Sequence, residues 1–420
     1  MKITLTQFRP NTAEAAWTDC FAQAIAELNK AGGGVLTVPA GEYTTGPIEL
    51  CSNVELHLEA GAVIRFLNDP AAFPLQECQY EGRISHRPKP CLSAYHAENV
   101  ALTGSGVLDG CGAPWWAGQR ARTLANGRPY LLHFEDVTHL RIRGVQLRNS
   151  PAWTVHPLNC VDVLIEDVSI CNPYHSPNTD GINPESCRDV RILGCRVDVG
   201  DDCITLKSGT EETPNPAPCE NIVIANCLLV HGHGGIVIGS EMSGGVRNVT
   251  VTNCVFTGTD RGLRVKTRRR RGGCVENLRL SNLVMERVFC PFVFNMYYSC
   301  GTAEKDRWVW EKTPYPVDGG TPAFRNIRIN GVTVVGATAS AGFFYGLAES
   351  PIDGLSLTDC HIEMARGAAP EKPAMMGNLE PMSARGFFLR NAKNVEFHNV
   401  TLKNADGEAY DTDASVDGVF

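Results

Sequence analysis

No stretch of this 420-residue sequence approaches the roughly 20 consecutive apolar residues that a membrane-spanning helix needs. The first ten residues, Met1 to Pro10, also lack the apolar segment and the cleavage site of a secretory signal peptide. These two absences predict a cytoplasmic protein that does not bind a membrane.

Paired cysteines are missing as well. The sequence has 17 cysteines, an odd number, and no two of them form a CxxC pair. Several occupy positions that suit a small buried hydrophobic residue, such as Cys227 within Ile224–Leu228. We therefore expect free thiols in a reducing compartment rather than the disulfide framework of a secreted protein. His231 and His233 have no third metal ligand at a suitable spacing, so we expect no metal and no cofactor.

Positive charge is also scarce. The sequence has 38 lysines and arginines against 46 aspartates and glutamates, and its formal net charge is −8. Because this balance repels polyanions from most of the surface, we expect no nucleic-acid partner. An acidic ligand would need a local cluster of positive side chains.

Helical periodicity is confined to residues 12–30, with Asn11 or Thr12 as the expected N-cap and the glycines at 32–34 as the stop. After this segment, a short unit returns along the chain, in which a corner residue precedes alternating apolar positions. The corner residues are Asn53, Asn99, His139, Asp162, Asp189, Asn221, Asn248, Asn277, Asn326, Gly354 and Asn394. From Asp162 to Asn277 the unit recurs after 27, 32, 27 and 29 residues.

A period of this length, with strands in every unit and no helices between them, predicts a parallel β-helix. We expect one all-β catalytic domain over residues 1–420, with the helix at 12–30 covering the open N-terminal end of the core. A β-sandwich is the alternative, but the sequence lacks its hairpin signals. Longer intervals, such as the 49 residues from Asn277 to Asn326, mark loops inserted into the coil.

Aligning the repeats between about 150 and 270 places chemically active side chains in register. One apolar column should point inward: Val155, Ile182, Ile204, Ile236 and Leu263. Because side chains alternate along a strand, the residues on either side of this column should point outward. They form one column of His156, Asn183, Thr205, Val237 and Arg264, and another of Leu158, Glu185, Lys207, Gly239 and Lys266. Asp180 and Asp202 share a third column with Trp153, and Asp201 aligns with His233.

Three carboxylates, an imidazole and two cations on one face suit the hydrolysis of a glycosidic bond to an acidic sugar. One carboxyl group protonates the leaving oxygen while another carboxylate takes a proton from water. Crowding of the carboxylates should raise the pKa of one of them. Arg264 and Lys266 should bind the carboxylate of a uronic acid. Asp201 and Asp202 can serve one site only if the backbone turns there, which Gly200 would permit.

Four motifs of the sequence resemble the signature of glycoside hydrolase family 28, the polygalacturonases. They are Asn178-Thr179-Asp180-Gly181, Gly200-Asp201-Asp202-Cys203, Gly232-His233-Gly234 and Arg264-Val265-Lys266. The resemblance extends over nearly the whole chain, and the segments after Ser240 and Lys266 are similar to the bacterial exo-acting branch.

This resemblance implies a right-handed parallel β-helix that hydrolyses α-1,4-galacturonosyl bonds with inversion. It implies that Asp201 is the general acid, that Asp180 and Asp202 activate water, and that His233 supports the acid. Arg264 and Lys266 would hold the substrate, and we expect the same of Asn178, Asn183 and Lys207.

The register adds a prediction of its own. Trp153 and His156 lie one coil before Asp180 and Asn183, so we expect them to form a sugar-binding subsite. Packing of the two side chains beneath a loop is the alternative.

Other activities stay open at this point. The family also suits cleavage of rhamnogalacturonan or another uronate-bearing polymer, and a β-helix can be a calcium-dependent pectate lyase or a non-catalytic sugar-binding protein. We expect exo-hydrolysis of short oligogalacturonides, because inserted loops at 66–96 and after Asn295 carry cations and aromatics that could close one end of a groove. The run Arg268–Arg271 could join those cations. We expect either Asp201→Asn or Asp202→Asn to remove most of the turnover while leaving the fold intact.

Overall fold

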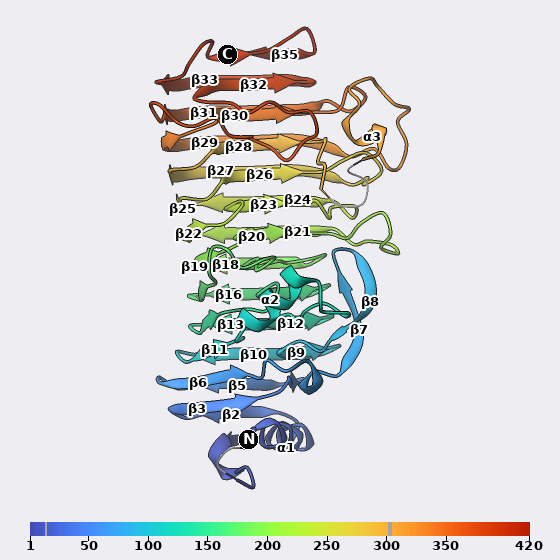
Figure 1. Ribbon diagram of the computed structural model, residues 1–420, viewed down its shortest axis with the longest axis vertical. Coiled ribbons are helices and arrows are strands. Elements are labelled where there is room, and N and C mark those ends of the chain that lie inside the picture. Colours follow the sequence, from blue (N-terminus) through green and yellow to red (C-terminus); the bar gives the residue numbers. More distant parts are fainter. Residues whose placement is uncertain (13–14, 301–304) are drawn as a thin grey trace. The chain divides into compact units, whose positions relative to one another are not determined.

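The computed structural model describes residues 1–12, 15–300 and 305–420. It divides into two compact units, Met1–Asp201 (the N-terminal unit) and Asp202–Phe420 (the C-terminal unit). In each unit, short parallel strands of successive coils stack on one another, as Figure 1 shows. The expectation of a single catalytic domain over 1–420 stays a prediction.

Among its described residues, the N-terminal unit has two parallel sheets, one antiparallel hairpin and two α-helices. The strands of its larger sheet are β1 (Lys2–Thr4), β2 (Gly34–Val38), β3 (Gly41–Thr45), β5 (Val54–Leu58), β6 (Ala62–Phe66), β10 (Glu98–Gly104), β11 (Val107–Asp109), β13 (Thr138–Arg143), β14 (Gln146–Arg148), β16 (Val161–Glu166), β17 (Ser169–Cys171), β18 (Arg188–Leu193) and β19 (Arg196–Val199). The smaller sheet contains β4 (Ile48–Leu50), β9 (Leu92–Tyr95), β12 (Leu132–Glu135) and β15 (Val155–Leu158). The remaining elements are the hairpin β7 (Leu75–Tyr80) and β8 (Arg83–Pro88), the helices α1 (Thr18–Lys30) and α2 (Ala113–Ala121), and the 3-10 turns η1 (Leu5–Gln7) and η2 (Pro70–Ala72).

The C-terminal unit repeats this plan. Its larger sheet contains β21 (Cys219–Ala225), β22 (Leu228–His231), β24 (Val246–Thr252), β25 (Val255–Thr257), β27 (Cys274–Glu286), β29 (Ala323–Ala337), β31 (Ile352–Met364), β33 (Ala392–Lys403) and β35 (Val416–Val419). Its second sheet contains β20 (Ile204–Leu206), β23 (Ile236–Ile238), β26 (Arg261–Lys266), β28 (Cys290–Asn295), β30 (Ser340–Tyr345), β32 (Arg385–Arg390) and β34 (Tyr410–Asp411). A short helix, α3 (Arg307–Trp310), lies in the loop between β28 and β29.

In-register stacking builds the core of each unit. In the N-terminal unit, Cα pairing aligns Leu56, Leu102, Ile142, Ile165 and Ile192 in one fully buried column. An equivalent column in the C-terminal unit contains Ile224, Val251, Leu280, Ile329, Leu357 and Phe397. Each coil therefore covers the apolar side chains of its neighbours, which is the main source of stability in a solenoid.

The corner residues identified in the sequence share one backbone conformation. All eleven have a positive φ, from 50° at Asn326 to 75° at Gly354. Asparagine, aspartate and glycine tolerate this left-handed region better than other residues, which explains their recurrence at this corner. Several of the asparagines also bind one another: Asn248 Nδ2 donates to Asn221 Oδ1 at 3.0 Å, and Asn277 Nδ2 donates to Asn248 Oδ1 at 3.0 Å.

The capping helix is shorter than the sequence predicts. It begins at Thr18 rather than at residue 12, and part of the predicted segment, residues 13–14, lies outside the described residues. The backbone N–H of Trp17 donates to Thr44 O at 2.8 Å, and the Thr18 hydroxyl accepts from the Gly46 N–H at 2.8 Å. These bonds tie the residues before the helix to the β3 end of the sheet, so the helix does not begin before Thr18. The buried face of α1 packs against β1, β2 and β4, so the predicted covering of the N-terminal coils is confirmed (Figure 1).

All 17 cysteines are free thiols, and twelve of them are buried, as expected for small core residues. Within the described part of the chain, no helix combines the length and the apolar character that a membrane span would require.

Two substitutions of the corner residue Asn248 should separate what its backbone conformation contributes to stability from what its side-chain hydrogen bonds contribute. We expect Asn248→Ala to lower the free energy of unfolding by about 1–2 kcal/mol, because alanine resists the left-handed conformation. Asn248→Gly should cost less, since glycine accepts that conformation and loses only the side-chain bonds. Urea unfolding measures both, with the exposed Thr250→Ala as a control of small effect on the same strand. Equal losses in the alanine and glycine variants would contradict the backbone argument.

Candidate active site

Asp202 lies at the centre of a buried ion cluster in the C-terminal unit. Arg264 donates to its Oδ1 at 3.0 Å and Lys266 donates to its Oδ2 at 2.8 Å. The exposed fractions of the three residues are only 2%, 3% and 7%. Burial alone would raise the pKa of Asp202, but Lys266 and Arg264 outweigh it and hold the pKa well below its usual range. Asp202 is therefore an ionised carboxylate, and crowding does not make it the protonated member of the set.

The strand register explains how these cations reach Asp202. On β26, Leu263 pairs with Ile236 and points inward, so its neighbour Arg264, which pairs with Val237, points to the other face. Val265 is buried between Arg264 and Lys266. The predicted alignment of Ile204, Ile236 and Leu263 is confirmed within this unit, as is that of Val155 with Ile182 in the N-terminal unit.

The outer face of β26 is largely covered, with exposed fractions of 3% at Arg264 and 7% at Lys266, so the sequence interpretation of an open solvent face was wrong. Arg264 Nη2 lies 3.0 Å from Met375 Sδ, and the ring of Tyr298 lies 5.3 Å from Lys266 Nζ. Asn295, the next residue along the Lys266 column, donates to Met375 O at 3.0 Å. The inserted segments that carry Tyr298 and Met375 therefore cover this face.

His233 differs from the cluster because its side chain is exposed. Its charge contributes to lowering the pKa of Asp202. Asp260, which sequence reasoning missed, is buried, and this burial raises its pKa although Arg261 and His233 oppose the shift. Asp260 directly precedes β26, and its position next to the Arg264 motif is the one sequence signal that could have drawn attention to it.

Lys207 does not offer a free cation. Its Nζ donates to Glu241 Oε2 at 2.8 Å, and both residues are buried. Burial would raise the pKa of Glu241, but Lys207 and Arg271 lower it to about 2. The predicted substrate contact of Lys207 is therefore replaced in this structure by an internal ion pair.

The arginine run after Lys266 also has internal partners. Arg268 and Arg271 both donate to Glu211, at 2.8 and 2.6 Å. Arg269 binds both carboxylate oxygens of Glu349, at 2.5 and 3.0 Å. These three arginines fasten loops to the coil, so they do not supply the expected free charge. Arg270 is exposed, and its guanidinium lies 4.3 Å from the ring of Trp308.

In the N-terminal unit, Asp180 and Asn183 are buried together. Asn183 Nδ2 donates to Asp180 Oδ2 at 3.1 Å, and the exposed fraction of Asp180 is 4%. Asn178 Oδ1 accepts from Arg128 Nη2 at 2.7 Å, while Arg128 Nη1 donates to Pro177 O at 2.5 Å. Arg128 thus holds the segment that precedes Asp180. Sequence reasoning missed Arg128, because it lies about fifty residues away in a loop with no recognisable pattern.

Asp201 is half-buried and follows β19 at a bend formed with Gly200. A Cβ on Gly200 would lie 2.4 Å from Ser176 O. Glycine is therefore required here by the close approach of another backbone segment.

Trp153 and His156 are not an accessible sugar subsite. The exposed fraction of Trp153 is 2%, and Tyr80 of the β7–β8 hairpin stacks on its indole at 4.8 Å between centroids. His156 is completely buried, and its Nε2 lies 3.0 Å from Glu185 Oε2. The alternative, packing of both residues beneath an inserted loop, is what the structure shows.

The ion cluster predicts that Asp202 supports the fold, which corrects the expectation that Asp202→Asn is structurally neutral. We expect this substitution to lower the free energy of unfolding at pH 7 by on the order of 3 kcal/mol, because two buried cations lose their counter-charge. Because the folded pKa is lowered, this stability is present above the unfolded value near pH 4 and is lost as the pH falls through the folded value. The difference from wild type should therefore narrow below about pH 4.

Urea unfolding at several pH values measures this dependence. Asp201→Asn is the matched control, because the Asp201 side chain is only half-buried. Equal destabilisation by the two substitutions would contradict a special structural role for Asp202.

Comparison with known proteins agrees with the fold and the motifs. The family model of Glycosyl hydrolases family 28 matches residues 32–366. A "Probable polygalacturonase" of Vitis vinifera is 31% identical over 363 residues, which cover 84% of this chain and 72% of that protein. An "Endo-polygalacturonase" of Pectobacterium carotovorum is 31% identical over 64% of this chain and 70% of that protein.

Among solved structures, a hyperthermoactive exopolygalacturonase from Thermotoga maritima matches with a TM-score of 0.78 and 29% identity, covering 96% of this chain and 92% of that one. The polygalacturonase from Erwinia carotovora, with a TM-score of 0.66 and 22% identity, shares the fold. These similarities confirm the predicted right-handed parallel β-helix. The chain belongs to glycosyl hydrolase family 28 and is a glycoside hydrolase.

Proposed function

We propose that this glycoside hydrolase cleaves α-1,4-galacturonosyl bonds in short oligogalacturonides, releasing sugar from a chain end with inversion. The observation that carries the proposal is the cluster of Asp202, Arg264 and Lys266, which has two positive charges against one negative charge. This surplus of positive charge suits the binding of an anionic sugar. An enzyme that acts on neutral sugars would not require such a surplus. The polygalacturonase names of the relatives support the same substrate class.

The carboxylates then divide the acid and base roles. Asp202, held ionised by its cations, suits the activation of water, and we assign Asp180 to the same step. Asp201 is the proposed general acid. His233, which aligns with Asp201 in the sequence register, is assigned to support it. Asn183 orients Asp180 through its 3.1 Å hydrogen bond.

Inversion requires that water attack opposite the leaving group while the acid protonates the leaving oxygen. No covalent sugar intermediate forms in this scheme. Arg264 and Lys266 hold Asp202 ionised in the free enzyme and, in the proposed complex, share their charge with a uronate carboxylate.

Two features support action at a chain end. In the N-terminal unit, the β7–β8 hairpin covers Trp153, and in the C-terminal unit the segments around Tyr298 and Met375 cover Arg264 and Lys266. Inserts of this kind close a groove and leave a pocket for a terminal sugar. The exopolygalacturonase from Thermotoga maritima, similar over nearly the whole chain, favours the same mode.

An endo-acting enzyme on the same substrate is the second candidate, because the Pectobacterium relative carries that name. The lyase and the binding-only alternatives lose their support, since the chain is a glycoside hydrolase.

We also propose that the protein works in a reducing compartment such as the cytoplasm, because its 17 cysteines are free thiols. Recovery of a full-length tagged protein with intermolecular or intramolecular disulfides from its native host would contradict this.

Product analysis tests the mode of action. From a defined galacturonate hexamer, we expect monomer or dimer to appear first, with the next shorter oligomer as the complementary product. The viscosity of long polygalacturonate should fall slowly relative to the release of reducing ends, because internal bonds stay intact. Oligomers of all intermediate lengths at early times, with a rapid loss of viscosity, would establish endo action.

The acid assignment predicts a large kinetic loss with a small structural one. We expect Asp201→Asn to lower kcat by about 10²–10⁴-fold, because general acid catalysis contributes on that order. The measurement is the initial rate on galacturonate trimer, with folding checked by urea unfolding. Asp198→Asn, which removes the partner of Arg196 elsewhere on β19, is the matched control and should retain full activity. Activity of Asp201→Asn within a few-fold of wild type would end the assignment.

A further inference from the structure

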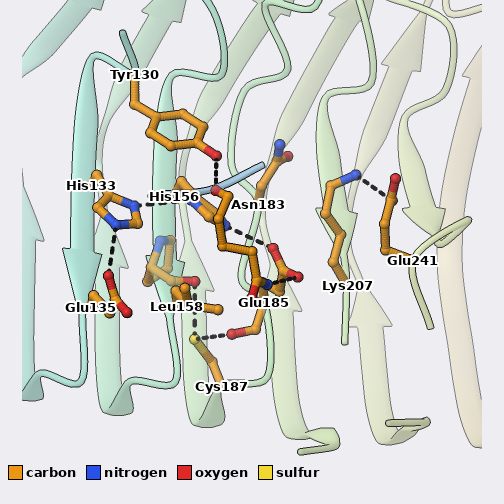
Figure 2. Close-up of polar contacts among 12 residues, drawn as sticks. Tyr130, His133, Glu135, His156, Leu158, Asn183, Glu185, Cys187, Lys207 and Glu241 are labelled. Atoms are coloured by element: carbon orange, nitrogen blue, oxygen red, sulfur yellow. Dashed lines mark hydrogen bonds and ion pairs between the residues drawn. The ribbon is translucent and has the colours of Figure 1, made fainter. Parts of the chain in front are cut away.

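Four side chains of the N-terminal unit form a chain that the proposed reaction does not use. Glu135, His133, His156 and Glu185, called the His–Glu quartet below, lie end to end in Figure 2. His133 Nε2 lies 3.4 Å from Glu135 Oε2, the two Nδ1 atoms lie 3.0 Å apart, and His156 Nε2 lies 3.0 Å from Glu185 Oε2. The arrangement follows from the pairing of β12 with β15, in which His133 is opposite His156.

The three contacts of the quartet can all be hydrogen bonds only if it holds one proton more than two neutral imidazoles supply. Each of its three contacts needs one hydrogen between two acceptors. Two neutral imidazoles supply only two hydrogens, so with both glutamates ionised one of the three contacts lacks a hydrogen. If both hydrogens point to the glutamates, for example, two bare Nδ1 atoms face each other at 3.0 Å. A third proton completes the set, and the quartet then carries two carboxylates and one imidazolium.

Two opposing effects act on a positive charge in the imidazole pair: burial of the rings disfavours it, and contact with an aromatic face favours it. Both rings are fully buried, and Tyr130 lies 5.1 Å from His133 and 4.8 Å from His156 between ring centroids. The hydrogen bond from His133 lowers the pKa of Glu135, which keeps that carboxylate ionised.

Apart from His96, which contributes to lowering the pKa of Glu135, the titratable groups named next stay in one state near neutral pH. Burial raises the pKa of Tyr130 well above its usual value and those of Cys78 and Tyr95 to about 12. Arg87 of β8 contributes to the pKa of both Cys78 and Tyr130. Histidine is the side-chain type that ordinarily changes charge between about pH 5 and 8.

The quartet is attached to the β7–β8 hairpin. Glu185 Oε1 accepts from Gln79 Nε2 at 2.6 Å, and the Tyr130 hydroxyl donates to Gln79 O at 2.5 Å. The next residue, Tyr80, stacks on Trp153 and carries Arg87 3.8 Å above its ring. Asp180 contributes to the raised pKa of Tyr80, so the hairpin lies close to that candidate catalytic carboxylate.

We propose that His133, His156 and Glu185 are positioning residues that, with Glu135, bind one proton beyond two neutral imidazoles and thereby hold the β7–β8 hairpin in place. As the pH rises and the extra proton leaves, two lone pairs face each other in the quartet and the hairpin loosens. The consequence for substrate binding rests on the proposed function, because the hairpin would form part of the wall around the sugar.

Glutamine at either end of the quartet gives a sharp test. In Glu185→Gln, the new amide N–H₂ donates to His156 Nε2, His156 Nδ1–H donates to His133 Nδ1, and His133 Nε2–H donates to Glu135. The amide oxygen still accepts from Gln79. One amide hydrogen and the two hydrogens of neutral imidazoles then fill all three contacts, so the hairpin should stay fixed at all pH values. In Glu135→Gln, the new amide would supply the third hydrogen at the other end of the quartet, so we expect the same result. Glu166→Gln is the matched control, because Glu166 pairs with Arg143 and not with the quartet.

Hydrogen exchange of the hairpin amides, compared between variants at each pH, is the first measurement. At pH 5.5 we expect equal protection in wild type and Glu185→Gln. At pH values where the extra proton leaves, the hairpin amides of wild type should exchange faster than those of the variant. The ratio of the two exchange rates should grow by up to about tenfold per pH unit, which is the largest slope that the loss of one proton allows. Equal protection at every pH overturns the proposal. The proposal is also overturned if hydrogen exchange of the hairpin amides depends on pH in Glu185→Gln in the same way as in wild type.

Histidine ring nitrogen NMR is the second measurement. Wild type should show one doubly protonated buried imidazole at pH 5.5, assigned by its loss in His133→Phe, and Glu185→Gln should show two neutral rings. Two neutral rings in wild type at pH 5.5 overturn the proposal. On galacturonate oligomers, KM of wild type should rise with pH more steeply than KM of Glu185→Gln, while the kcat profiles coincide. Hydrogen exchange and NMR do not depend on turnover of a substrate. They therefore test whether the His–Glu quartet holds the hairpin even if the proposed substrate is wrong.

Discussion

In-register stacking of short parallel strands is the constraint on which the rest of this molecule depends. Every coil must return to the same position above its predecessor, because its backbone hydrogen bonds and its apolar column are completed only by neighbouring coils. The left-handed corner residues make that return possible, and the asparagine contacts between corners run alongside the strands. A side chain that is two residues from a corner in one coil therefore lies beside its counterpart in the next.

Because of this stacking, the spacing of residues in the sequence determines which reactive side chains lie together. On β26, alternation places Arg264 and Lys266 on the same face, where both reach Asp202 of the same unit. Burying one carboxylate with two cations keeps the carboxylate ionised and leaves a surplus of positive charge. The same residues thus contribute to folding and to the proposed recognition of an anionic sugar, so a loss of activity in their variants has to be separated from a loss of stability.

The inserted segments change what the outer face of the coil can do. Columns that alternation directs away from the core are buried again, beneath the β7–β8 hairpin in the N-terminal unit and beneath the loops of Tyr298 and Met375 in the C-terminal unit. Polar side chains in these covered columns must find internal partners. Lys207 pairs with Glu241, three of the four arginines at 268–271 fasten loops, and the two histidines join two glutamates.

The sequence by itself determined the parallel β-helix, the positions of its corners, and the inward register of Val155 with Ile182 and of Ile204 with Ile236 and Leu263. It did so because periodicity and alternation are local properties that repeat in every coil. Only the tertiary structure decided which outward residues are accessible. Trp153 and Lys207 were misjudged because their partners, Tyr80 and Glu241, lie in segments with no fixed spacing to them. His156 was misjudged although Glu185 lies in the next coil of the register, because alternation alone does not show that this face is covered. The late start of the capping helix has a similar cause, since Trp17 and Thr18 bind residues of the sheet that lie far along the chain.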